Sequence, residues 1–273
     1  MKYVRIVVVI LLIASLAIYA SGTIKEKREE DPTMPTITSD RDVVEVSVNY
    51  EEADLLAGLE AYDEKDGDLT SDILVGEFSQ FVEKGMCNIT YVVFDSSNQA
   101  ARLSRKVKFL DYESPKFTVS EPLIFTVGKS ESAVERVKAT DLLDGNITAL
   151  VKQTATTIDY RTEGDYTITV EVTNSFGDVS QETLPVHVIE PSRQALKISL
   201  SDYVIYIRQG EEFDPRSYIE SLEDSYGEVL DTGGVQVDSE VDTQTEGCYE
   251  VHYEAKNENG LKGETWMTVI VRA

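Results

Sequence analysis

The sequence predicts an all-β protein in which three tandem β-sandwich repeats follow an N-terminal hydrophobic helix. The chain has 273 residues, which is about right for two or three domains. A set of motifs recurs along it at regular spacing. Between the motifs, short runs alternate apolar and polar residues, as half-buried strands do.

Residues 1–24 are predicted to direct the chain to a membrane. Lys2 and Arg5 precede the uncharged apolar run Ile6–Ala20, and the next residues, through Ile24, carry no charge. A basic start followed by such a run is typical of a signal peptide or a signal anchor. The segment therefore predicts translocation of the rest of the chain.

Two outcomes for this segment stay open. Small residues suitable for cleavage end at Ala17 and Gly22, which fits a secreted protein. We favour a retained anchor, because the apolar run continues past the first of these positions. In both cases residues 25–33 form a charged linker, and residues 34–273 lie outside the cytoplasm at the cell surface.

Four landmarks define the repeats. The motif DG[DN][LI]T occupies residues 66–70 and 144–148. A glycine then opens a strand, an Asn- or Asp-rich turn follows, and a valine lies in the closing strand. The glycine and valine pairs are Gly85 with Val107, Gly164 with Val186, and Gly247 with Val269. We infer repeat 1 at 34–113, repeat 2 at 114–193 and repeat 3 at 194–273.

The strand after each glycine predicts which side chains face the core. Alternate positions are apolar, and the intervening ones are mostly polar. Because successive side chains in a strand point to opposite faces, the apolar set should be buried. That set is Cys87, Ile89, Tyr91 and Val93; Tyr166, Ile168, Val170 and Val172; Tyr249, Val251, Tyr253 and Ala255. Cys248 falls on the opposite parity and is predicted to be exposed and unpaired.

The repeat motif resembles a known Ig-like repeat of bacterial surface proteins. This repeat also occurs in pesticidal crystal toxins, and hyalin-type Ig-like repeats are similar to it at a greater distance. The resemblance covers about residues 34–272. Repeats 1 and 2 carry the DG[DN][LI]T half, whereas repeat 3 carries the segment Gly210–Pro215 (GEEFDP). It implies three Ig-like sandwiches that serve as spacers or binding platforms, and it implies little about the ligand.

The charge of the chain excludes nucleic acid as a partner. The net charge is −25, with 50 acidic and 25 basic residues. Every repeat has an acidic excess, so none offers a basic surface for phosphate groups. The acidic surface is interpreted mainly as a solubilising one.

Enzymatic activity is not expected. The sequence has two histidines, His187 and His252, which lie in different repeats and at positions predicted to face solvent in mid-strand. A hydrolase needs a nucleophile beside a base that a third group orients. The sequence pattern predicts no such set and no glycine-rich phosphate loop.

The acidic turns are the best metal candidates. They contain Asp63, Asp66 and Asp68 in repeat 1, and Asp141, Asp144 and Asn146 in repeat 2. Calcium prefers several oxygen ligands from a compact loop, but the glycine positions do not fit an EF-hand. We therefore favour turn formation by Asp-Gly over calcium binding, within or between repeats, and expect no cofactor.

Trp266 is the one residue singled out as an exposed contact. It lies on the parity opposite Val269, so its ring points away from the core of its own repeat. Such a ring could stack on a sugar or a partner, although packing between repeats is favoured.

Together these features predict a non-catalytic, membrane-anchored spacer or adhesion platform for a protein or polysaccharide of the cell envelope. A calcium-rigidified adhesion module is the alternative, and an accessory region of a separate secreted enzyme is a third. Melting with and without calcium separates the first two.

Overall fold

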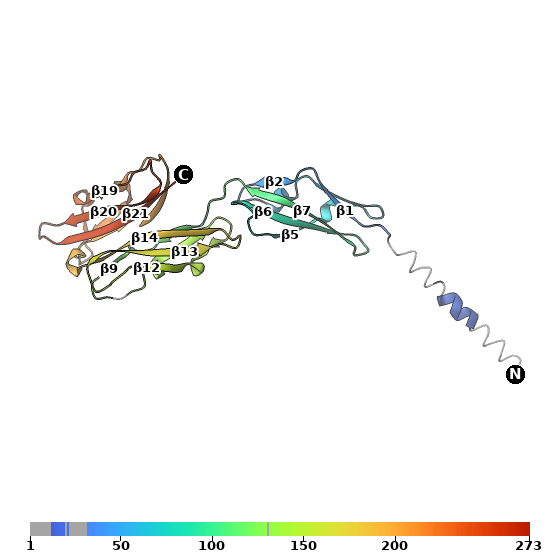
Figure 1. Ribbon diagram of the computed structural model, residues 1–273, viewed down its shortest axis with the longest axis horizontal. Helices are drawn as coiled ribbons and strands as arrows, with labels where there is room; N and C mark the ends of the chain where they lie inside the picture. Colours follow the sequence, from blue (N-terminus) through green and yellow to red (C-terminus); the bar gives the residue numbers. More distant parts are fainter. Residues whose placement is uncertain (1–11, 20, 22–31, 130) are drawn as a thin grey trace, which may run out of the picture. The chain divides into compact units, whose positions relative to one another are not determined.

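Strands dominate the computed structural model, which describes residues 12–19, 21, 32–129 and 131–273 (Figure 1). The chain divides into two compact units, residues 1–111 and 112–273. The first unit holds repeat 1, and the second holds repeats 2 and 3. The all-β class is confirmed, and each repeat consists of a three-stranded and a four-stranded sheet.

Repeat 1 has seven strands, one short α-helix and one 3₁₀ turn. They are β1 (Thr36–Ser39), β2 (Val43–Val46), α2 (Glu52–Leu56), β3 (Leu59–Asp63), β4 (Gly67–Asp68), η1 (Thr70–Asp72), β5 (Leu74–Phe78), β6 (Met86–Phe94) and β7 (Ala100–Phe109). The sheets have the orders β1-β3-β4 and β2-β7-β6-β5, with β2 parallel to β7.

Repeat 2 repeats this topology. Its elements are β8 (Lys116–Val119), β9 (Ile124–Thr126), η2 (Ala133–Arg136), β10 (Val137–Asp141), β11 (Gly145–Asn146), η3 (Thr148–Leu150), β12 (Lys152–Thr156), β13 (Gly164–Thr173) and β14 (Val179–Ile189). The sheets are β11-β10-β8 and β12-β13-β14-β9, and β9 runs parallel to β14.

Repeat 3 follows the same plan. The 3₁₀ turn η4 (Pro191–Arg193) leads into it from repeat 2. Its elements are β15 (Lys197–Leu200), β16 (Val204–Arg208), η5 (Pro215–Tyr218), β17 (Ile219–Glu223), β18 (Val229–Leu230), η6 (Thr232–Gly234), β19 (Gln236–Ser239), β20 (Gly247–Lys256) and β21 (Lys262–Arg272). The sheets are β15-β17-β18 and β16-β21-β20-β19. The boundaries at 113/114 and 193/194 remain predictions, since repeats 2 and 3 belong to one compact unit.

The strand register bears out the alignment of the repeats. The position two residues after each landmark glycine pairs directly with the landmark valine of the next strand. The three pairs are Cys87 with Val107, Tyr166 with Val186, and Tyr249 with Val269. Motifs that recur in the sequence therefore occupy equivalent places in each four-stranded sheet.

The predicted parity is also confirmed, except that Tyr166 and Tyr249, near the start of their strands, are only half-buried. Cys87, Ile89, Tyr91 and Val93 are fully buried, whereas Cys248 is exposed and both thiols are free. Burial raises the pKa of the Cys87 thiol to about 11. The inward set is buried because a slip of one residue would expose every apolar side chain of the strand.

In two repeats, a tyrosine hydroxyl near the start of the strand that follows the landmark glycine forms a hydrogen bond to the preceding loop. Tyr166 donates to the carbonyl of Thr162 at 3.0 Å, and Tyr249 donates to the carbonyl of Thr245 at 3.0 Å. This is the bond of a tyrosine corner, a feature of Ig-like sandwiches. Repeat 1 has Cys87 in this place and so lacks the hydroxyl.

The predicted membrane segment Ile6–Ile24 falls largely outside the described residues. Residues 12–19 and 21 are helical. Among the described residues, no helix combines the length and the apolar character that a membrane crossing requires. Anchoring by residues 1–24 therefore remains a prediction.

Candidate functional site

The acidic turn of repeat 1 is closed by its own carboxylates. Asp63 Oδ1 accepts the backbone N–H groups of Lys65 at 2.8 Å and Asp66 at 3.1 Å. Asp68 Oδ1 accepts the N–H of Thr70 at 2.9 Å. These short-range bonds are those by which Asp residues shape turns.

Repeat 2 forms the same turn. Asp141 Oδ1 accepts the N–H groups of Leu143 and Asp144, each at 2.9 Å, and Asn146 Oδ1 accepts that of Thr148 at 3.0 Å. Within the described parts of the chain, no three His, Cys, Asp or Glu side chains are grouped so that they could hold a metal ion. Neither turn alone therefore forms an acidic cage, and calcium binding there stays a hypothesis.

Trp266 lies in a stack of three rings where repeats 2 and 3 meet. Its indole lies 4.0 Å from the His187 ring, with 15° between the planes, and 4.6 Å from the His252 ring, with 22°. His187 comes from β14 of repeat 2, and the other two residues come from β21 and β20 of repeat 3. The indole is half-buried and points away from its own core, toward the neighbouring repeat.

The solvent-facing position predicted for His187 is wrong. Only 4% of this residue is exposed, because the outer face of β14 is covered by repeat 3. Its Nδ1 lies 2.8 Å from Asp165 Oδ1, and its Nε2 lies 2.7 Å from Glu250 Oε1. A protonated imidazole donates to both carboxylates at once, which the neutral ring cannot do.

Burial and the neighbouring carboxylates have opposite effects on the pKa of His187. Burial lowers the pKa, while the hydrogen bonds and charges of Glu250 and Asp165 raise it by more. The pKa of His187 therefore lies above its usual value, so folding stabilises the charged form of this side chain relative to its unfolded state.

We expect this histidine to make the unit formed by residues 112–273 more stable at mildly acidic than at alkaline pH. Its folded pKa lies above the unfolded value of about 6.5, so the stabilisation is complete below that value. It is lost as the pH rises through the folded pKa. Thermal melts of the wild type and His187→Gln between about pH 5.5 and 8.5 measure this component. Identical pH profiles for the two proteins would contradict it.

Ion pairs flank the stack. Arg193 Nε donates to Glu264 Oε1 at 2.8 Å and Arg193 Nη2 donates to Glu264 Oε2, which makes the pair bidentate. Arg193 Nη1 also reaches Glu163 at 2.6 Å. The Glu264 side chain is 3% exposed and that of Arg193 is 35% exposed, so the carboxylate of this pair is shielded from solvent. Arg272 of repeat 3 and Glu182 of repeat 2 form a further pair across the junction.

The junction also has an apolar part. Val204 and Ile270 of repeat 3 belong to the same buried cluster as the core of repeat 2. The Tyr206 hydroxyl accepts the N–H of Phe117 at 3.0 Å. Val204 and Ile270 extend the core of repeat 2 across the junction, while the other buried apolar residues of repeat 3 form a core of their own.

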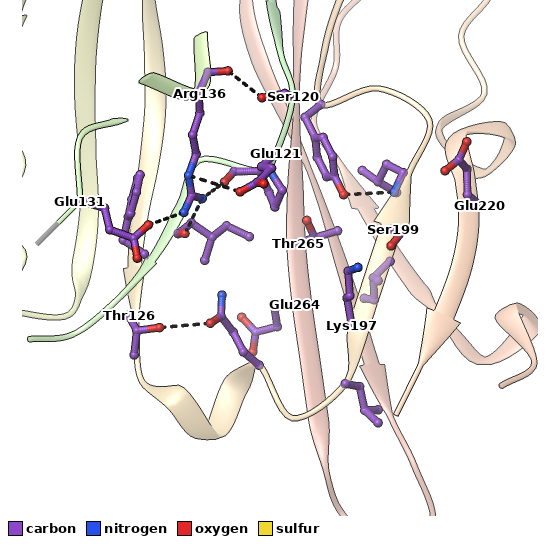
Figure 2. A pocket seen from close by; sticks show the side chains of 18 of the residues that line it. Ser120, Glu121, Thr126, Glu131, Arg136, Lys197, Ser199, Glu220, Glu264 and Thr265 are labelled. Carbon is purple, nitrogen blue, oxygen red and sulfur yellow. Dashed lines mark hydrogen bonds and ion pairs between the residues drawn. The ribbon is translucent and has the colours of Figure 1, made fainter. Parts of the chain in front are cut away.

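A polar groove of about 700 Å³ opens beside the junction (Figure 2). Its rim includes β9 and β15, each of which is the last strand of its sheet. Arg136 lies in its wall, with its guanidinium 4.3 Å from the Phe125 ring and 2.6 Å from Glu131. Lys129 and Lys197 line it as well. The groove offers charged and hydroxyl groups to a polar ligand.

A comparison with protein families decides the type of the third repeat. Residues 200–271 match the bacterial surface protein Ig-like domain. The predicted resemblance to this bacterial surface Ig-like domain is thereby confirmed, and its match includes the segment Gly210–Pro215. The fold of repeats 1 and 2 follows the same strand order.

A curated relative is the pesticidal crystal protein Cry22Aa of Bacillus thuringiensis. It is 29% identical over 252 residues, which cover 88% of this chain and 33% of the relative. The chain thus spans about a third of the length of that relative. The similarity includes the repeats and does not extend to the remainder of the crystal protein.

Two solved structures with similar segments are a bacterial enzyme fragment and a protocadherin fragment. The M60 catalytic domain with the CBM51-1 and CBM51-2 domains of Clostridium perfringens ZmpB is 14% identical, covers 89% of this chain and 31% of that chain, and has a TM-score of 0.24. The protocadherin GammaB4 extracellular domain is 13% identical, with coverages of 89% and 50% and a TM-score of 0.23. With scores this low, the Ig-like assignment rests on the strand order and on the family match.

Proposed function

We propose that this chain is a non-catalytic spacer and binding platform at the bacterial cell surface, held there by residues 1–24. The family match of residues 200–271 supports the surface location. The junction of repeats 2 and 3 is the observation that carries the platform role. A stack of rings, two ion pairs and the packing of Val204 and Ile270 against the core of repeat 2 join these repeats into one compact unit.

A joined pair of repeats suits presentation better than a flexible linker does. A ligand surface that spans both repeats keeps its shape only if the relative orientation of the repeats is restrained. If the repeats moved freely, binding would have to order them, and that cost would lower the affinity. The groove between β9 and β15 is such a surface. We propose that it contacts a polar protein segment or polysaccharide of the envelope.

The histidines support the non-catalytic assignment. Both ring nitrogens of His187 lie against carboxylates, and both faces of Trp266 are occupied by histidine rings. Among the described residues these groups serve packing, and neither histidine ring is paired with a serine, threonine or cysteine nucleophile.

Binding to envelope material tests the proposal. The purified full chain is expected to sediment with isolated envelopes, and Lys129→Glu plus Lys197→Glu is expected to weaken binding at least about tenfold. The matched control is Lys138→Glu plus Lys152→Glu, which makes the same charge change in repeat 2 at exposed positions outside the groove. Equal binding by the two double variants would remove the groove from the proposal.

Exposure on intact cells tests the location. Protease added outside should degrade residues 34–273, and the mature protein should start before residue 17. Protection of these repeats in intact cells would contradict a surface role, whereas a start near Ile18 or Thr23 would mean that the segment is cleaved.

A further inference from the structure

Two buried carboxylate oxygens in repeat 1 lack any hydrogen-bond partner. They are Oδ2 of Asp63 and Oδ2 of Asp95, in residues that are 1% and 5% exposed. Within the described ranges, no lysine or arginine forms an ion pair with either residue. An unpaired carboxylate is costly to bury, so this arrangement requires an explanation.

Both carboxylates are held firmly by their other oxygen. Asp63 Oδ1 accepts N–H groups within its own turn, as described above. Asp95 Oδ1 accepts the N–H of Ser97 at 2.8 Å and that of Gln99 at 2.7 Å. The two turns are joined, because Asp66 Oδ2 accepts the N–H of Ser96 at 2.8 Å. Each Oδ2 atom is thus fixed in position and free to bind a ligand.

In repeat 2, the residues equivalent to Asp63 and Asp95 are joined by a hydrogen bond. Asp141 occupies the place of Asp63, since each pairs with the glycine of its Asp-Gly turn. Asn174 occupies the place of Asp95, and each accepts the backbone N–H four residues ahead. In repeat 2 the Asn174 amide donates to Asp141 Oδ2 at 3.1 Å.

The hydrogen bond that links the Asp-Gly turn to the turn after the central strand is the same in both repeats. Asp144 Oδ2 accepts the N–H of Ser175 at 2.6 Å, as Asp66 does with Ser96. By this correspondence, Asp63 and Asp95 occupy the places where repeat 2 has an acceptor and a donor 3.1 Å apart. In repeat 1 both groups are acceptors.

A tyrosine hydroxyl also contacts the Asp141–Asn174 pair in repeat 2. The Tyr112 hydroxyl accepts from the Asn174 amide at 2.8 Å and donates to Asp178 at 2.8 Å. The register of β1 and β8 places Pro32 at the position of Tyr112 in repeat 1. Proline brings no hydroxyl, so neither donor of repeat 2 is present there.

We propose that Asp63 and Asp95 bind a calcium ion between their Oδ2 atoms. Two like charges in a buried corner repel one another, and a divalent cation balances both. Calcium takes oxygen ligands in variable number, so two carboxylate oxygens suit it, with neutral oxygens and water as the further ligands. This site differs from the acidic turns singled out in the sequence, because it pairs one turn residue with a residue of the distant β6–β7 turn.

Calcium is then expected to stabilise the first unit and leave the second unchanged. Calorimetric titration of the full chain should show one site per chain. In thermal melts, the transition of repeat 1 should rise by at least about 5 °C in millimolar calcium relative to chelator. This inference is independent of the proposed platform role, since it concerns repeat 1 alone.

Two variants with the same change of charge distinguish the proposed calcium site from the Asp-Gly turn. Asp95→Asn restores the residue of repeat 2, so it should abolish the calcium response and be at least as stable as the wild type in chelator. Asp68→Asn also copies repeat 2, at the position of Asn146, and it should retain the full response because Asn can still accept from Thr70. No calcium binding by the wild type, or an equal response from Asp95→Asn, would overturn the proposal.

Discussion

Replacing Arg105 with alanine is expected to destabilise repeat 1 by about 3–5 kcal/mol. This residue is 4% exposed in β7, and its guanidinium donates to the Ala57 carbonyl at 2.9 Å, to the Leu55 carbonyl and to the Tyr91 hydroxyl at 3.1 Å. The two carbonyls end helix α2. Alanine would remove these donors, would leave the buried Leu55 carbonyl with the Tyr91 hydroxyl at 2.7 Å alone, and would also leave a cavity.

Two optical signals separate this effect from changes elsewhere. The chain has one tryptophan, Trp266, which reports on the second unit. Arg105→Ala should shift the denaturant midpoint seen by far-UV circular dichroism for repeat 1 and leave the tryptophan transition in place. Arg102→Ala, on an exposed position of the same strand, should change stability by less than about 0.5 kcal/mol. A loss below about 1 kcal/mol for Arg105→Ala would show that the carbonyls find other donors.

Trp266→Ala is expected to uncouple repeats 2 and 3 at a loss of about 2–4 kcal/mol. The indole fills the space between His187 and His252, and its removal takes away both stacked contacts. The ion pair of Arg193 with Glu264 would then lose part of its shielding from water. The transition of the second unit should split into two steps, with repeat 3 and repeat 2 unfolding separately.

Differential scanning calorimetry measures this uncoupling. Tyr226→Ala is the matched control, since this aromatic ring also lies in repeat 3 and is 94% exposed. It should leave one transition at the wild-type temperature. If Trp266→Ala also melts in one step at the wild-type temperature, the stack does not couple the repeats.

The sequence by itself determined the repeat structure and the inward face of each central strand. Alternation along a strand is a local property, because the pleat sends successive side chains to opposite faces. The pattern from Cys87 to Val93 therefore predicted burial correctly, and the equivalent patterns of repeats 2 and 3 did so except at Tyr166 and Tyr249, which are only half-buried. The Asp-Gly turns were predictable for the same reason, since their bonds join residues two or three apart.

Only the tertiary structure decided what covers the outward faces. His187 and Trp266 have outward parity, but parity refers to one sheet and carries no information about a neighbouring repeat. Arg105 shows the converse, because it has inward parity where repeats 2 and 3 have Leu184 and Met267. Its burial depends on carbonyls at the end of α2, about fifty residues away in sequence.

The pairing of Asp63 with Asp95 is likewise a tertiary result. Each residue has an evident local role in its own turn, so the sequence offers no reason to connect the two. An alignment of the repeats shows Asp95 at the position of Asn174 and Pro32 at the position of Tyr112. This difference was the sequence signal that pointed to an unusual site in repeat 1. Its meaning depends on distance in space, because a carboxylate needs a cation only where folding has removed water and every other donor.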